Sequence, residues 1–424
     1  LKAGSSLSVA DHSTLSALNG TLDLSAPKTT FGKALTLEAK KLGLTTSNDI
    51  SLTDSSLTAG TDGLSLVSSE GSVSIDGGAL TSQNSINVSS AKDTTISRTA
   101  VSSEGNDVEA GVFLSSSEGA VKVSDGSINS NGSVKLSAVT DAQLTNVSVS
   151  AKGTGEGSGV EVNSSQGSVM IDAGQLDSQS SIRLTSAAGT QVMGADLIAA
   201  GTGESEGLFI TSNGGAVEVT SNTVSSGSVI DIASQKDASL TVESLNAAGK
   251  LDVESKEGSI NVSSEANGNT GGLQAAAENG SVTLKGLNVD SSTDIDVLAK
   301  DSISVTGGSL KNKDGSNLIL VSKEGNLNLA LNEKNLAADT ITLKGKGELN
   351  LTGYTLVASK GDLKVATGGL NIKDASLSTS TPGSVLLSAE EGNVDSNNKT
   401  SIDSAGSLEA VSYTHLRAHE TRRH

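Results

Sequence analysis

The fold of this chain is decided by the stretch SSEGSVSIDGGALTSQNSINVSS, residues 68–90. Its apolar residues come in pairs two positions apart, Val73 with Ile75 and Ile86 with Val88. A spacing of two is typical of a half-buried strand, because successive side chains of a strand point to opposite faces. Glycines separate these short apolar segments, and glycine permits tight changes of direction. The stretch therefore predicts short strands joined by corners.

The same pattern recurs at a fixed distance. Gly71, Gly119, Gly167 and Gly215 are 48 residues apart, and each closes a turn that reads SSEG, SSEG, SSQG or SNGG. Three copies, residues 72–119, 120–167 and 168–215, align without a gap. A period of this kind indicates a stack of similar units, in which each unit contacts its neighbours.

Further along the chain, the spacing shows that one copy is a pair of coils. Equivalent turn glycines follow at Gly258, Gly325 and Gly392, so the first interval after Gly215 is shorter than a copy and the next two are longer and equal. The segment 259–280 is a single unit with its own turn, and it accounts for the additional length of the first long interval. One coil is therefore about 22 residues long, and each copy contains two.

Strands this short and this regularly spaced cannot pair as local hairpins. Equivalent strands of successive coils can instead stack in parallel, with a right-handed connection. We predict an all-β fold, a right-handed parallel β-helix (a solenoid) of about 18 coils, each with four or five buried aliphatic residues. It forms a single shaft over residues 1–410, which we interpret as a fragment that is open at both ends.

Composition limits the function. The net charge of −19 disfavours nucleic acid as a partner, because phosphate binding requires clustered Lys and Arg. The chain has no Cys, so it has no disulfide and no thiol nucleophile. No stretch approaches the roughly 18 apolar residues of a membrane span, so we expect no membrane insertion of this segment.

The sequence offers few residues for catalysis. Before residue 411 the only histidine is His12, so a Ser/His/Asp arrangement has almost no candidates. Asp76 and Asp172 occupy equivalent places, but Ser124 stands between them in the repeat. A solvated strand face is expected around Asp294 and Asp296. We predict that this segment is not an enzyme and has no catalytic, cofactor-binding or metal-binding residue and no cofactor.

Two surface features remain as candidates for contact with a partner. One outward position of the repeat carries two aromatic residues and an acid. A polar, acidic loop recurs at a second position, and stacked loops of this kind would form a ridge; a tolerated insertion is the simpler explanation of these loops. The candidate contact residues are Phe113, Glu161 and Phe209 at the first position and Glu109, Glu156 and Glu206 in the loops.

The last fourteen residues, 411–424, abandon the pattern. They contain three of the four histidines and no glycine. They resemble a translated sequencing adapter, and we interpret them as a non-native tail that is excluded from fold reasoning. The alternative is a genuine histidine-rich tail with affinity for metals.

Two phrases resemble the repeats of filamentous-haemagglutinin-type adhesins. They are LSLVSSEGSVSIDGGALTSQNSINVSS, residues 64–90, and LILVSKEGNLNLALNEKNLAADTITLKGKGELNL, residues 318–351. The resemblance implies the shaft of a Gram-negative adhesin, exported by two-partner secretion through an outer-membrane pore. It would be extracellular or on the outer cell surface, where its partner is a host or bacterial surface protein or glycan.

Other functions are compatible with the same pattern. The passenger of a single-chain autotransporter is similar in sequence. The segment could also belong to a carbohydrate-active β-helix, or form the stalk of a toxin-delivery protein, with the active part outside it.

Overall fold

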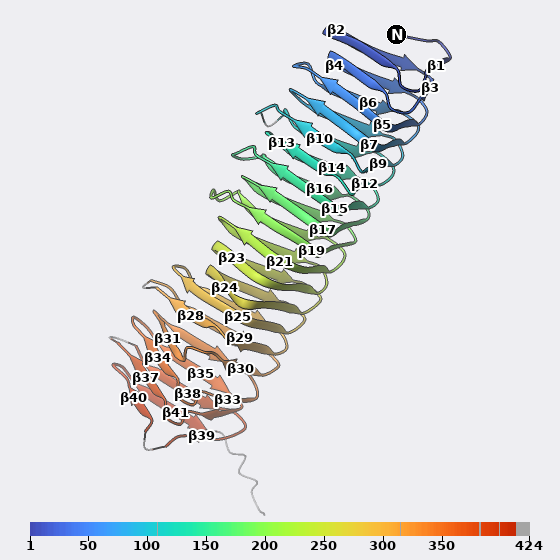
Figure 1. Ribbon diagram of the computed structural model, residues 1–424. Helices are drawn as coiled ribbons and strands as arrows, with labels where there is room; N and C mark the ends of the chain where they lie inside the picture. Colours follow the sequence, from blue (N-terminus) through green and yellow to red (C-terminus); the bar gives the residue numbers. More distant parts are fainter. Residues whose placement is uncertain (108, 314, 381–382, 398, 413–424) are drawn as a thin grey trace, which may run out of the picture. The chain divides into compact units, whose positions relative to one another are not determined.

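The computed structural model describes residues 1–107, 109–313, 315–380, 383–397 and 399–412. These residues form strands and turns without a helix, and hence without a helix that could cross a membrane. The chain divides into two compact units, Leu1–Gly249 and Lys250–His424. Each unit is a stack of coils built from parallel strand pairs (Figure 1).

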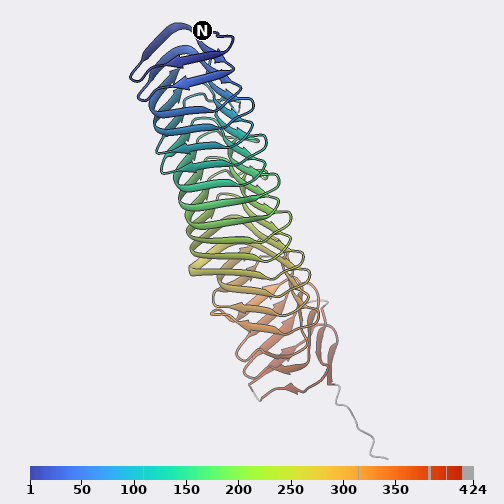
Figure 2. The same ribbon diagram turned by 90° about the vertical axis from the view of Figure 1, so that its right-hand side faces the viewer.

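One coil of the first unit shows the plan of the fold. Strand β6 (Leu64–Ser68) lies on a first face, and the chain turns through the SSEG corner into β7 (Val73–Ser82). β7 bends at Gly77 and Gly78, so its first half lies on a second face and its second half on a third. Another corner leads to β8 (Ile86–Ser90), which pairs with β6. Figure 2 shows such corners following one another from coil to coil.

The other strands of the first unit repeat this plan. They are β1 (Ser6–Val9), β2 (Thr14–Ala26), β3 (Lys28–Phe31), β4 (Thr36–Thr46), β5 (Ile50–Ala59), β9 (Thr94–Ser97), β10 (Ala100–Ser103), β11 (Val112–Ser116), β12 (Val121–Ser124), β13 (Ser127–Ser130), β14 (Val134–Ala138), β15 (Ala142–Ala151), β16 (Gly159–Ser164), β17 (Ser168–Ser178), β18 (Ser181–Ser186), β19 (Gly189–Ala199), β20 (Gly207–Ser212), β21 (Val217–Ser226), β22 (Val229–Ser234) and β23 (Ala238–Ser255), whose last residues belong to the second unit.

The strand register explains the period of the repeat. On the first face, the step from Leu64 to its partner Ile86 is short, and the step from Ile86 to its partner Val112 is longer. The two steps alternate, since a short step from Val112 to Val134 is followed by a long one from Val134 to Val160. The prediction that each copy of the repeat contains two coils is therefore confirmed. The additional residues of every second coil form the polar loop between the third face and the first.

The second unit contains shorter strands. They are β24 (Ile260–Ala277), β25 (Val282–Ser291), β26 (Ile295–Ala299), β27 (Ile303–Thr306), β28 (Ser309–Asn312), β29 (Leu318–Ser322), β30 (Leu327–Ala330), β31 (Asn335–Ala338), β32 (Ile341–Lys344), β33 (Glu348–Asn350), β34 (Thr355–Ala358), β35 (Leu363–Thr367), β36 (Gly369–Asn371), β37 (Ser376–Thr379), β38 (Val385–Ala389), β39 (Val394–Asp395), β40 (Ser401–Asp403) and β41 (Leu408–Ser412).

Coils of the second unit keep a nearly constant length. Its first face runs from Leu273 through Ile295, Leu318 and Ile341 to Leu363 in steps of about 22 residues. In each of the two units, parallel strands stack in coils of about 22 residues. This confirms the predicted β-solenoid of about 18 turns.

Aliphatic side chains fill the interior. In the coil that begins at Leu64, the inward residues Leu64, Leu66, Val73, Ile75 and Leu80 are all at most 1% exposed. Burial of such a side chain contributes about 1.5–3 kcal/mol, largely offset by the entropy of ordering the chain. Five aliphatic residues per coil agree with the expected four or five.

One aromatic residue belongs to the core of the second unit. Tyr354 is 2% exposed, and its hydroxyl accepts a hydrogen bond from the Leu331 backbone N–H at 3.0 Å. Burial raises the pKa of this phenol, although the hydrogen bond from Leu331 opposes the shift. The sequence pattern, with so few aromatic residues, did not predict this position.

Candidate binding surface

The predicted contact residues at the first position share one column on the first face, but they are not neighbours. Phe113 pairs with Lys135, Lys135 with Glu161, Glu161 with Arg183 and Arg183 with Phe209. Each pairing is a step of one coil. Lys135 therefore lies between Phe113 and Glu161, and Arg183 lies between Glu161 and Phe209. We call these five residues the first-face strip.

The first-face strip contains two kinds of contact between neighbouring coils, an ion pair and a cation–π contact. The Lys135 Nζ lies 3.7 Å from Glu161 Oε2, and the Arg183 guanidinium carbon lies 4.0 Å from the centre of the Phe209 ring. Exposed pairs of these kinds contribute little to stability, up to about 1 kcal/mol each. The strip is thus a surface feature in which cation, acid and aromatic ring are held at one strand spacing from each other.

Arg183 also connects the strip to the polar loops. Its Nη2 donates a hydrogen bond to the Ser205 carbonyl oxygen, in the loop of the next coil. The loops at residues 104–111, 152–158 and 200–206 precede β11, β16 and β20, the strands that carry Phe113, Glu161 and Phe209. The two features predicted separately from the sequence therefore lie beside each other along one edge of the first face.

The three loop acids have different environments. Glu109 and Glu156 are exposed, whereas the Glu206 carboxylate accepts hydrogen bonds from the Gly203 N–H at 2.8 Å and the Gly155 N–H at 3.1 Å. The Gly203 N–H above all lowers the pKa of Glu206. Glu206 therefore links the loops of two coils that are not adjacent, and only Glu109 and Glu156 point their charge at solvent.

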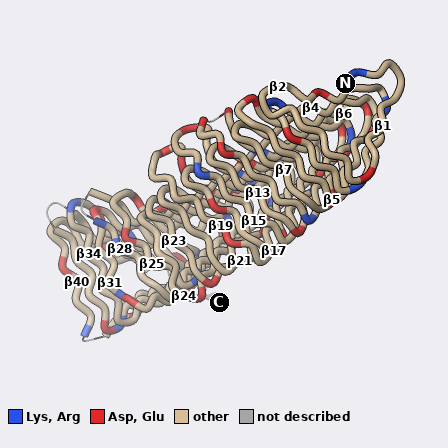
Figure 3. The backbone as a smooth tube through the Cα atoms, turned by 45° about the horizontal axis from the view of Figure 1, so that its top comes forward, with Lys and Arg blue, Asp and Glu red and all other residues tan. Residues whose placement is uncertain are grey.

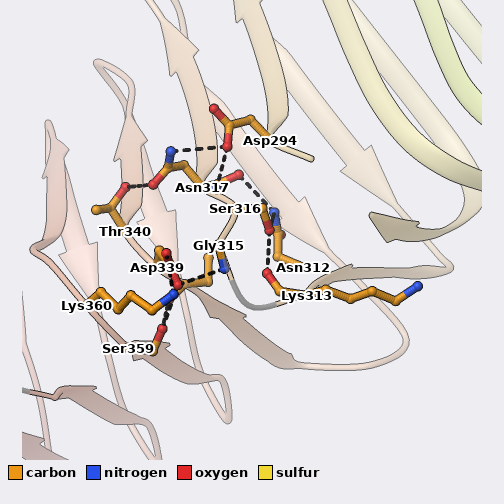
Figure 4. A network of polar contacts seen from close by, with 11 residues as sticks. Asp294, Asn312, Lys313, Gly315, Ser316, Asn317, Asp339, Thr340, Ser359 and Lys360 are labelled. Atoms are coloured by element: carbon orange, nitrogen blue, oxygen red, sulfur yellow. Dashed lines mark hydrogen bonds and ion pairs between the residues drawn. The ribbon is translucent and has the colours of Figure 1, made fainter. Parts of the chain in front are cut away.

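Acidic and basic residues are interspersed over the coils of both units (Figure 3). A compact polar network lies at a corner of the second unit (Figure 4). There Asp294 accepts hydrogen bonds from the backbone N–H and the side-chain amide of Asn317, at 2.7 and 3.1 Å. Thr340 donates to the amide oxygen of Asn317 at 2.7 Å. This network joins three successive coils, so we assign its residues a structural role in the stack.

A second part of this corner is built on Asp339. Its carboxylate accepts hydrogen bonds from Gly315 N–H, Ser359 Oγ and Lys360 Nζ at 3.2, 3.0 and 3.1 Å. Burial opposes ionisation of Asp339, but these hydrogen bonds outweigh it and the pKa is lowered. Its donors come from the corners of the preceding and the following coil, which again indicates a structural role.

The expectation of a solvated face around Asp294 and Asp296 is wrong for Asp296. One of its carboxylate oxygens, Oδ1, is buried and has no hydrogen-bond partner. Burial, followed by the nearby charge of Asp294, raises the pKa of Asp296. Its neighbours in the column are Gln274 and Ile319, and neither carries a positive charge that would favour ionisation of the acid.

Asp76 and Asp172 lie in one outward column of the second face, separated by Ser97, Ser124 and Thr145. They are four strands apart, so they form no common site. Asp76 instead forms an ion pair with Arg98, whose Nη2 lies 2.5 Å from its Oδ2, and this contact lowers the pKa of Asp76.

The predicted turn glycines share a hydrogen bond that explains their spacing from serine. In six of the seven turns the glycine N–H donates to the hydroxyl of the serine three residues earlier, at 2.8–3.2 Å; these are Gly71, Gly119, Gly167, Gly215, Gly258 and Gly325. Gly392 has Ala389 at the corresponding place. The Ser-x-x-Gly motif is therefore a property of the corner.

Sequence reasoning missed the backbone conformation of the bend between the second and third faces. Positive φ angles occur there at Asp54, Arg98, Asp125 and Asn146, between 50° and 53°. Glycine is the residue that adopts such angles easily, and Asp and Asn tolerate them better than Arg. Gly126 follows Asp125, but no glycine stands beside Asp54, Arg98 or Asn146, so glycine gives no signal for those three bends.

Among the described residues, no group of three or more His, Asp or Glu could hold a metal ion. His12 is exposed, and the three histidines of the tail lie outside the described residues, as does the tail from residue 413 onwards. Comparisons with protein families, curated proteins and solved structures find no match to this chain.

Proposed function

We propose that the chain is part of the shaft of a large bacterial adhesin that is secreted or exposed on the outer cell surface. The observation that carries the proposal is the uniform stack of coils. The first face of the first unit alone joins ten successive coils, from Leu22 to Ile230. At about 4.8 Å per coil, this stack is about 45 Å long. A solenoid of this kind places a binding region at a distance from its anchor.

Export through an outer-membrane pore suits the same architecture. Each coil contacts mainly its neighbours, so the stack can form one coil at a time as the chain emerges. The chain has no Cys, and hence no disulfide loop that would have to pass the pore. The similarity of the repeats to filamentous-haemagglutinin-type adhesins supports this route.

The first-face strip and the exposed acids Glu109 and Glu156 are the surface that we assign to contact with a partner. The partner is a cell-surface protein or glycan of a host or of another bacterium. Half-buried aromatic rings and charged side chains at fixed spacing supply both apolar contact and hydrogen bonds, the two components of a recognition surface.

Adhesion of the purified chain tests the proposal. Beads coated with the chain should bind cultured epithelial cells or bacteria more strongly than beads coated with albumin. Removing the two rings with Phe113→Ser and Phe209→Ser should lower binding, whereas Thr95→Ala and Thr145→Ala on the second face should leave it unchanged. Equal binding of coated and albumin beads to every cell type would contradict the adhesive role.

A further inference from the structure

The only two methionines of the chain lie together on the second face of the first unit. Met170 belongs to β17 and Met193 to β19, strands of adjacent coils. Met170 pairs with Gln191, and Asp172 pairs with Met193, so the two thioethers are diagonal neighbours. Both line one hollow in the surface, whose polar and thioether lining is Gln143, Thr145, Met170, Asp172, Gln191 and Met193.

Neither methionine fills the core. Both are 37% exposed and occupy outward positions, whereas methionine is normally among the buried residue types. The residues paired along the column of Met170 are Lys122, Gln143, Gln191 and Glu218, all polar. Packing therefore does not account for two thioethers at this place.

The lining of the hollow has the chemistry of a soft-cation site. A thioether is an uncharged, polarizable donor that selects soft ions such as Cu(I), and a nearby carboxylate can balance the charge of such an ion. The Met170 Sδ already lies 4.0 Å from the Gln143 side-chain nitrogen, so this sulfur faces polar groups of the hollow. Asp172 is the single charged residue of the lining, and it would neutralise a monovalent cation.

We propose that this hollow binds one soft monovalent cation, Cu(I) or Ag(I), through the sulfur atoms of Met170 and Met193 and the carboxylate of Asp172. The flexible methionine side chains can converge from neighbouring strands without a change in the backbone. Hard divalent ions such as Mg²⁺ and Ca²⁺ are disfavoured, because thioether sulfur is a poor ligand for them and the hollow offers a single carboxylate to balance their charge. This site is independent of the adhesive role.

Silver nitrate in a chloride-free buffer is the probe, and the full chain with ¹³C-labelled methionine methyl groups is the reporter. Methionine occurs nowhere else, so each of the two methyl signals reports on the hollow and neither responds to silver at the tail histidines. Both signals should shift along one common titration curve, and Mg²⁺ should shift neither. No shift at millimolar silver would overturn the proposal.

Variants distinguish a shared site from two separate thioethers. Met170→Leu should weaken the response of the Met193 methyl about tenfold or more, and Met193→Leu should do the same to Met170. Asp172→Asn should also weaken binding, whereas Asp177→Asn, on the third face of the same strand, should not. The proposal fails if the remaining methyl of either leucine variant titrates as it does in the unchanged chain.

Discussion

Serine and glycine at the corners explain much of the unusual composition of this chain. The hydroxyl of Ser68 donates to the Asn48 carbonyl of the preceding coil at 2.6 Å and accepts from the Gly71 N–H at 3.1 Å. One small side chain thus satisfies two backbone groups of the corner, which would be costly to leave without a partner. The neighbouring corner residues are joined to the preceding coil by backbone hydrogen bonds, from Ser69 N–H to the Thr46 carbonyl at 3.0 Å and from Glu70 N–H to the Ser47 carbonyl at 2.9 Å.

Replacing this hydroxyl should destabilise the first unit. Ser68→Ala leaves the Gly71 N–H and the Asn48 carbonyl without their partner, at a cost of about 1–3 kcal/mol. Ser69, the next residue, is exposed, so Ser69→Ala should change stability by less than about 0.5 kcal/mol. Urea unfolding followed by circular dichroism measures both, and equal stability of the two variants would contradict the role of the hydroxyl.

Glycine is required in these turns by close approach to the preceding coil. A Cβ atom on Gly167 would lie 2.5 Å from Asp141 Oδ1 and 2.6 Å from the Thr140 backbone. Asp141 Oδ1 cannot withdraw freely, because it accepts the Ser168 N–H at 2.9 Å. Gly167 has no positive φ, so the constraint is steric.

Gly167→Ala should therefore cost about 1–3 kcal/mol by forcing the two coils apart. Gly20→Ala is the matched control, because no neighbouring heavy atom lies within 4 Å of its added Cβ. It should be neutral or slightly stabilising, since alanine reduces the freedom of the unfolded chain. Thermal unfolding of both variants checks the difference, and a harmless Gly167→Ala would show that the corner can relax.

At the level of single residues, the sequence predicted the buried aliphatic positions and the turn glycines. It did not predict the bend at Arg98, where a residue other than glycine has a positive φ and no glycine stands beside it. Ion pairing accounts for Arg98, since Asp76 holds it and Asp54 and Asp125 add favourable charge from neighbouring coils. The acids that hold Arg98 belong to coils one and two steps away. A comparison of the repeat copies does not show that they lie near Arg98.

The coil, rather than the copy that the glycines delimit, is the structural element of this protein. Shorter and longer coils alternate in part of the first unit, so a comparison of copies aligns every second coil. For this reason the sequence identified Phe113, Glu161 and Phe209 and missed Lys135 and Arg183. Lys135 and Arg183 are recognised as members of the first-face strip only from the pairing of the strands, which the sequence alone does not give.

Two loops of the longer coils, at residues 152–158 and 200–206, are connected to each other through Glu206. Its pKa lies below the ordinary value of 4.5, so the carboxylate stabilises the loops fully above pH 4.5. This stabilisation is lost as the pH falls through the lowered pKa. The same logic applies to Asp339, whose donors hold it ionised.

Glu206→Gln should loosen the loop at residues 200–206, because a neutral amide accepts weaker hydrogen bonds than a carboxylate. We expect the Gly155 and Gly203 amide protons to exchange roughly threefold faster at pH 7, and the acid-dependent loosening to disappear. The matched control is Glu204→Gln, at an exposed residue of the same loop. Unchanged exchange at Gly155 would show that the two loops are held by other contacts.

At the scale of the whole molecule, fold and function differ in how far the sequence reveals them. The fold follows from periodicity, because every coil must bury the same few aliphatic positions, as Leu184 and Leu343 do in the two units. The outward positions carry no such constraint. Met170 and Met193 stand out in no repeat pattern, since their proximity appears only when the coils are stacked in register.

A stack whose coils contact mainly their neighbours should respond locally to damage. Leu184→Ala removes a side chain that is 0% exposed in the first unit, at a cost of about 2–5 kcal/mol. Hydrogen exchange measured by mass spectrometry should accelerate in the adjacent coils and remain unchanged in the second unit. Leu343→Ala, at an equally buried residue of the second unit, should give the reverse pattern. Equal acceleration along the whole chain by either variant would mean that it unfolds as one cooperative body, in which a local defect weakens every coil.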